Sequence, residues 1–184
     1  MKLILLLLFG LTIGLTMLLK YKVAPDYGPD VGARFLERLN YIPSQQPRLL
    51  SYSTFASWLD DPAKDAARNG YAFPVLFPYD LLFLICLGAL LGFASVYFVS
   101  FLSFLSGVPD WVWWALPAAY IVADLAEDCY AAALLKSALA LTDHSFALMR
   151  RLTTLKLATV NVAIGQVAFL GTLAALVRIF PAKA

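Results

Sequence analysis

Three carboxylates interrupt an otherwise apolar stretch of this chain, and they are the residues best placed to do chemistry. Asp124, Glu127 and Asp128 lie near the middle of residues 111–135, which are long enough to cross a bilayer as a helix. Residues three and four positions apart share a helix face, so the three side chains are expected to point to one side. An ionised group in a membrane interior costs roughly 2.5–3.5 kcal/mol, and such residues normally face a protein interior or a hydrated cavity.

A second apolar stretch near the end of the chain can supply partners for these acids. If residues 157–177 return antiparallel to residues 111–135, Lys156 comes within reach of the carboxylates, and polar side chains follow it along the same helix. One lysine cannot neutralise three carboxylates, so one or two of the acids are expected to hold a proton. The predicted buried polar cluster comprises Asp124, Glu127, Asp128, Lys156, Asn161 and Gln166.

Three kinds of function could use this cluster. Carboxylates at membrane depth commonly form a path for protons or cations. Three acids could instead hold a hard metal cation through oxygen in a membrane-embedded enzyme, although the chain has no second acidic motif that would complete such a site. The third function is recognition of a cationic or polar head group.

A fourth interpretation needs no chemistry, because a buried ion pair between two helices can hold them together. Removing one partner of such a pair is costly, since the other charge is left uncompensated. We expect this role: a non-catalytic structural or partner-binding protein, with no metal and no cofactor. The alternative is a small proton- or cation-linked carrier or channel component, or a membrane-embedded enzyme that uses the same cluster.

The composition of the chain indicates a membrane protein. Of its 184 residues, 61% are hydrophobic and 14% are charged, against about 45–50% and 25% in soluble domains. The net charge of +2 is too small to suggest a nucleic-acid partner, and no basic patch with interleaved aromatic residues supports one. Cys86 and Cys129 each stand alone in an apolar run, which argues against a zinc ribbon or a dithiol redox site.

Four apolar blocks predict an all-α fold, a four-helix transmembrane bundle that forms one domain over residues 1–184. The first block is expected to remain as an uncleaved helix, because no small-residue cleavage site follows it. The distribution of lysine and arginine near the ends of the blocks favours a topology with both termini outside. The expected spans are residues 3–19, 81–104, 111–135 and 157–177.

A polar, partly helical segment, residues 20–79, is expected between the first two spans. In its second half Asp61 is the expected N-cap of a short helix with Pro62 at the first position. Gly70 is expected to close that helix. Asp80 falls at the first turn of the second span, where a negative charge suits the helix dipole, so we expect it to cap the helix and to take no part in catalysis.

Two further signals concern helix packing and a helix start. Gly88 and Gly92 form a GxxxG motif, which lets another helix approach closely. Besides the lipid bilayer, the expected partners are therefore another membrane protein or a second copy of this chain at these glycines. Thr142 or Asp143 is expected to cap a helix that runs on into the fourth span.

Four short motifs resemble a family of small, uncharacterised bacterial four-helix integral membrane proteins. The resemblance covers residues 50–171, and the sequence differs from the family pattern at Asp128, where an asparagine is expected. It implies only the four-helix architecture and the combination of Asp124, Glu127 and Lys156, and no activity. We expect a multi-pass location in the bacterial inner membrane. The matching motifs are residues 67–71, 80–83, 124–128 and 153–156.

Overall fold

The computed structural model describes residues 1–23 and 51–180, and these residues form helices and no strands. The predicted all-α class is therefore confirmed for the described part of the chain, while the first half of the predicted polar segment lies outside it. The helical elements are α1 (Lys2–Leu18), η1 (Leu19–Val23), α4 (Tyr52–Asp60), η4 (Pro62–Lys64), α5 (Asp65–Gly70), η5 (Tyr71–Asp80), α6 (Leu81–Val99), η6 (Ser103–Leu105), α7 (Asp110–Leu135) and α8 (Asp143–Ile179).

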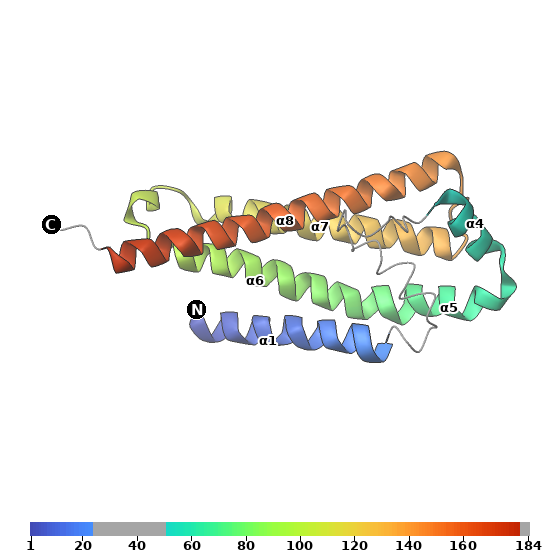
Figure 1. Ribbon diagram of the computed structural model, residues 1–184, viewed down its shortest axis with the longest axis horizontal. Coiled ribbons are helices and arrows are strands. Elements are labelled where there is room, and N and C mark those ends of the chain that lie inside the picture. Colours follow the sequence, from blue (N-terminus) through green and yellow to red (C-terminus); the bar gives the residue numbers. More distant parts are fainter. Residues whose placement is uncertain (24–50, 181–184) are drawn as a thin grey trace.

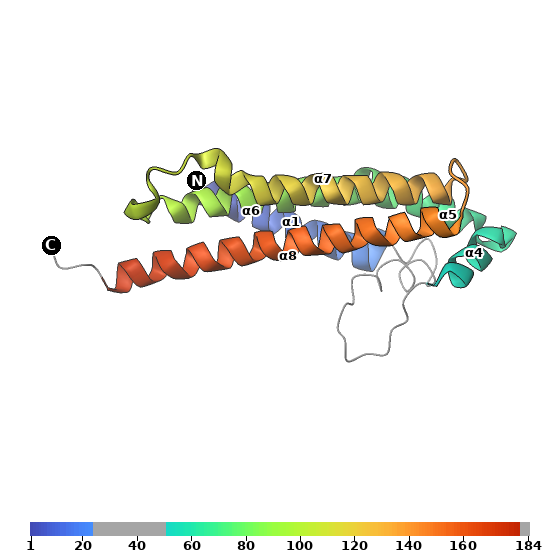
Figure 2. The ribbon, with the colours of Figure 1, turned by 90° about the horizontal axis from the view of Figure 1, so that it is seen from above.

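The long helices run roughly parallel to one axis of the molecule (Figures 1 and 2). Helix α7 packs against both α6 and α8, α6 also contacts α8, and α1 packs against α6. The start of α1 and the end of α8 lie at the same end of the molecule, and α4 and α5 lie at the other. The short connection through η6 makes α6 and α7 an antiparallel pair.

Three helical stretches are long and apolar enough to cross a membrane: Lys2–Val23, Pro62–Val99 and Asp143–Ile179. They contain the predicted spans 3–19 and 157–177, and the predicted span 81–104 except for its last five residues, because α6 ends at Val99. Helix α7 is not one of them, because Asp124, Glu127 and Asp128 lie within its apolar stretch. The length and composition of three helical segments thus favour membrane association. Whether α7 also crosses a membrane must be argued from its surroundings.

Two helix boundaries were predicted in the segment before α6, at Asp61 and at Gly70. Asp61 caps η4 as predicted, because its side chain accepts a hydrogen bond from the Ala63 N–H at 2.9 Å and Pro62 follows it. Helix α5 does end at Gly70. Gly70 is not the expected C′ glycine beyond the helix, however, because its backbone is right-handed helical and the chain continues into η5. The backbone becomes extended later, at Phe73 and Phe77, which both precede a proline that disfavours helical geometry there.

The start of α8 agrees with the prediction. The Thr142 side chain accepts a hydrogen bond from the Ser145 N–H at 3.1 Å, and the Ser145 hydroxyl in turn accepts one from the Thr142 N–H at 2.8 Å. This reciprocal capping box satisfies two backbone donors at the helix start. The helix then continues without interruption through the predicted fourth span.

The Gly88 and Gly92 face of α6 is covered by α7 of the same chain. A Cβ atom added to Gly88 would come within 2.5 Å of the Ile121 side chain, and one added to Gly92 would overlap the Trp114 ring. Trp114 is held in place by an edge-to-face contact with Phe93, with ring centroids 5.0 Å apart. The glycines therefore serve packing within the chain, and their close contact needs neither the expected partner protein nor a second copy to explain it.

The buried apolar residues form three groups along the helices. One group joins α4, η5, the end of α7 and the start of α8, and includes Phe55, Tyr71 and Leu134. A second joins the middle parts of α6, α7 and α8 around Leu84 and Tyr120. A third lies around the end of α6 and the last part of α8. Any polar group between the first two is enclosed by apolar packing on both sides.

Replacing Gly92 by alanine should weaken the α6–α7 contact, because the new methyl group meets a ring that is itself packed. Overpacking of this kind typically costs about 1–3 kcal/mol. Gly165→Ala is the matched control, since a Cβ atom added there would have nothing within 4 Å and alanine favours a helix. In mixed micelles the free energy of unfolding should fall for Gly92→Ala and should not fall for Gly165→Ala. Equal stability of the two variants would contradict this packing.

Candidate functional site

Polar and charged side chains from α6, α7 and α8 meet between the first two apolar groups. On α7 the order along the chain is Tyr120, then the acids, then Ala131, and these buried residues share one face. We call the meeting point the acid–lysine cluster; it comprises Asp80, Asp124, Glu127, Asp128 and Lys156.

The lysine of this cluster bridges α8 to α7. Lys156 Nζ forms an ion pair with Asp124 Oδ1 and a second one, at 3.0 Å, with Glu127 Oε2. The side chains of Lys156, Asp124 and Glu127 are 15%, 2% and 7% exposed, so the charges are largely withdrawn from solvent. The prediction that Lys156 reaches the acids is confirmed, and this contact fixes the register of the two helices.

Two hydroxyl groups complete the surroundings of the ion pairs. The Thr153 hydroxyl donates a hydrogen bond to Glu127 Oε1 and lies 3.1 Å from the Met149 carbonyl oxygen. The Tyr120 hydroxyl bonds to Asp124 from one turn earlier in α7. A buried carboxylate needs several hydrogen bonds to offset its loss of water, and these hydroxyls supply some of them. Neither hydroxyl was predicted to belong to the cluster.

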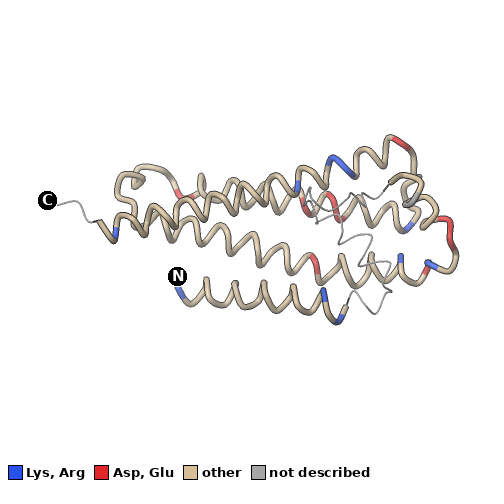
Figure 3. The backbone as a smooth tube through the Cα atoms, in the orientation of Figure 1, with Lys and Arg blue, Asp and Glu red and all other residues tan. Residues whose placement is uncertain are grey.

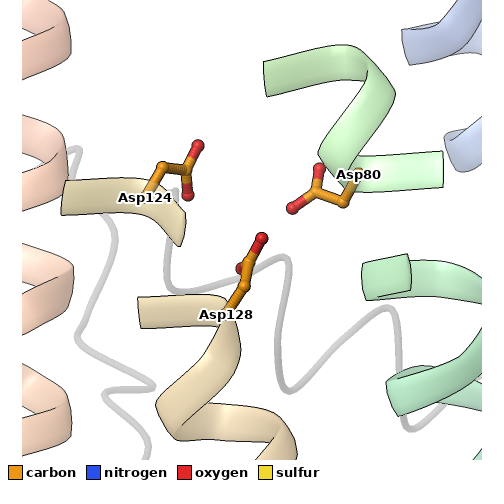
Figure 4. Close-up of side chains that lie close together, drawn as sticks. All are labelled: Asp80, Asp124 and Asp128. Carbon is orange, nitrogen blue, oxygen red and sulfur yellow. The ribbon is translucent and has the colours of Figure 1, made fainter. Parts of the chain in front are cut away.

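A second face of the cluster consists of aspartates only. One carboxylate oxygen from each of Asp80, Asp124 and Asp128 lies within 4.8 Å of the others, and Figure 4 shows the three side chains directed toward a common point. We call these three residues the aspartate group. Two of them come from α7, and Asp80 comes from the junction of η5 and α6.

The prediction that Asp80 caps the start of the second span is wrong. Its side chain makes no capping hydrogen bond, and its backbone is helical, so it does not serve as the expected cap. It stands at the head of the buried face of α6, which continues through Leu84, Gly88 and Ser95 at helical spacing. In the antiparallel α6–α7 pair, the contact of Gly88 with Ile121 places Asp80, two turns away, level with the acids of α7. An alignment of α6 against α7 through Gly88 could therefore have placed Asp80 in the cluster.

Asn161 and Gln166 do not belong to the cluster, so that part of the prediction is wrong. Asn161 is on an exposed face of α8. Gln166 lies ten residues beyond Lys156, or about 15 Å along the helix, and forms a separate polar contact. Its Nε2 group donates to Ser95 Oγ and to the Trp113 carbonyl oxygen, both at 2.8 Å. This contact joins α8 to α6 and α7 at a second level.

The cluster was predicted near the middle of an apolar span. In the structure it lies instead at one end of the uncharged helix segments. Asp80 directly precedes the uncharged part of α6, and Lys156 directly precedes that of α8. The segment η1, with Lys20 and Lys22, contacts η5, which ends at Asp80. Figure 3 shows long uncharged stretches toward the chain ends and most charged residues in the other half. The charges are therefore closer to an interface than to a bilayer centre.

Comparison with known proteins supplies no relative for this chain, since no family model, no curated protein and no solved structure matches it.

The Thr153 hydroxyl offers a local test of the site. Thr153→Val keeps the side-chain shape but removes the hydrogen bond to the buried Glu127 carboxylate. Hydrogen bonds to charged groups contribute about 1.5–3 kcal/mol, and we expect a loss of that size in the free energy of unfolding. Thr154→Val is the control, because Thr154 is exposed and its hydroxyl donates to the Arg150 carbonyl oxygen of its own helix. A control that lost as much stability would show that the Glu127 contact is not responsible.

Proposed function

We propose that the chain is a multi-pass integral membrane protein in which α7 crosses the bilayer together with α1, α6 and α8. The 26 residues of α7 span about 39 Å, which exceeds the hydrocarbon thickness of about 30 Å. Its acids are buried against α6 and α8, so that none needs to meet lipid. This arrangement supports a four-helix bundle, and the proposed location is the bacterial inner membrane.

We further propose that this bundle is non-catalytic and acts as a structural or partner-binding unit. The observation that carries the proposal is the double ion pair of Lys156 with Asp124 and Glu127 across α7 and α8. Apolar groups lie on both sides of this contact and limit its exposure to solvent. A nearby groove between α7 and α8 has walls that include Ala115, Val122 and Leu155 but none of the charged residues of the cluster. These features favour a contact that holds helices over one that exchanges ligands with solvent.

A second candidate is a small proton- or cation-linked carrier or channel component. It is favoured by Asp80, which brings a further carboxylate from the junction of η5 and α6 to the cluster. The three members of the aspartate group carry more negative charge than Lys156 can offset, so this side of the cluster requires protons or another cation. In this candidate, the ion pair would support the helices while the aspartate group handled the transported charge.

The structural proposal predicts a specific pattern of loss and recovery. Lys156→Met leaves two buried acids without their cation, which should cost about 3–5 kcal/mol in the free energy of unfolding. Combining it with Asp124→Asn and Glu127→Gln removes the unpaired charges, and most of the loss should be recovered. Lys136→Met is the control, because Lys136 is exposed after the end of α7; it should change stability by less than about 0.5 kcal/mol.

The measurement is unfolding of the full chain in mixed micelles, followed by circular dichroism. A Lys156→Met variant as stable as the wild type would contradict the structural role of the ion pair. A triple variant that folds well and yet no longer moves protons or cations in liposomes, where the wild type does, would favour the carrier over the structural proposal.

A further inference from the structure

We infer that the aspartate group, Asp80, Asp124 and Asp128, binds one hard divalent cation of the magnesium, calcium or manganese class. This inference goes beyond the structural role proposed above, because the ion pair of Lys156 would hold α7 to α8 with or without such a cation. The binding site would instead join α7 to the start of α6.

The first support is the geometry of the carboxylates. One oxygen from each aspartate lies within 4.8 Å of the other two. Hard divalent cations bind carboxylate oxygens at about 2.0–2.6 Å, so two ligand oxygens on opposite sides of one cation lie about 4–5 Å apart. Figure 4 shows side chains from two helices that point toward one another. One cation could therefore contact all three aspartates with small side-chain adjustments.

The second support is a buried carboxylate oxygen that accepts no hydrogen bond. Asp128 is 3% exposed, and its buried Oδ2 atom accepts no hydrogen bond, although its carboxyl group lies beside that of Asp80. In Figure 4 the Asp128 carboxylate points toward the space between Asp80 and Asp124. A buried polar atom without a partner costs about 1–3 kcal/mol, and more if it is charged. A bound cation at this point would remove that penalty.

The third support is the position of the lysine. Lys156 makes its ion pairs with Asp124 and Glu127, and no ion pair joins it or another described cation to Asp80 or Asp128. Asp124 is shared between the two halves of the cluster, so one of its oxygens can face the lysine while the other faces the aspartate group. One lysine and one divalent cation together carry three positive charges, which offset all but one of the four carboxylates of the acid–lysine cluster.

The ligand atoms indicate the class of cation. All three are carboxylate oxygens, which magnesium, calcium and manganese prefer, whereas zinc and copper sites commonly use cysteine or histidine. Cys129 follows Asp128 directly but is exposed, and so it lies on another face of α7. The Tyr120 hydroxyl bonds to Asp124, and such contacts orient metal ligands.

Binding of Mn²⁺ alone to the purified full chain in detergent tests this inference. Free Mn²⁺ is measured by its electron paramagnetic resonance signal as protein is titrated. The wild type should bind one Mn²⁺ per chain, and Mg²⁺ should compete. Asp80→Asn and Asp128→Asn should each weaken the affinity at least tenfold, while Asp110→Asn, an exposed acid in the first turn of α7, should not. Absence of wild-type binding, or equal binding by all variants, would overturn the inference.

A second measurement decides the question even if the asparagine variants fail to fold. With Cys86 replaced by serine, a nitroxide label on Cys129 should lose signal amplitude when Mn²⁺ binds, because the label lies beside Asp128. A label on Thr172→Cys in a chain without the native cysteines is the control, since Thr172 is about 24 Å along α8 from Lys156. Broadening of both labels to the same extent would contradict binding at the aspartate group. Absence of broadening for both labels would contradict it as well.

Discussion

A buried charge in an apolar bundle must have a partner, and the pairing of Lys156 with Asp124 and Glu127 meets this requirement here. Both acids come from α7 and the lysine comes from α8, so the pair fixes how these helices align. Once that register is set, Thr153 falls beside Glu127 and Gln166 falls beside Trp113. The Thr153 and Gln166 contacts are therefore consistent with the register that the lysine sets. Removing Lys156 would leave two buried carboxylates without their cation.

The surroundings explain how so many charged groups are accommodated. Apolar groups lie on both sides of the cluster along α7 and α8: one with α4 and η5, the other in the middle of the bundle. The cluster lies where the uncharged segments of α6 and α8 begin. In the proposed membrane protein, this position is near an interface, where an ionised group is less costly than at the bilayer centre. The segment before α6 thus has a clear role, because it covers the charged end of the long helices.

The sequence predicts the helices and the lysine partner, because both follow from local patterns: apolar runs of sufficient length, a capping box at Thr142, and acids that share one helix face. It predicts helix faces between distant segments less well. Asn161 is five residues from Lys156, which is about 140° around the helix, so it points elsewhere although it lies nearby along the axis. Asp80 resembles a helix cap until α6 is aligned against α7. Gly88 and Gly92 signal a close contact, but a GxxxG motif does not identify the helix that makes it.

An experimental structure of the full chain in a lipid nanodisc tests the central claim most directly, through the distances from Lys156 Nζ to the surrounding carboxylates. We predict that the ammonium group lies within about 4 Å of oxygens from both Asp124 and Glu127, with Asp80 and Asp128 facing each other on the other side of Asp124. A Lys156 side chain directed toward lipid head groups or solvent, with no carboxylate within that distance, would contradict the account.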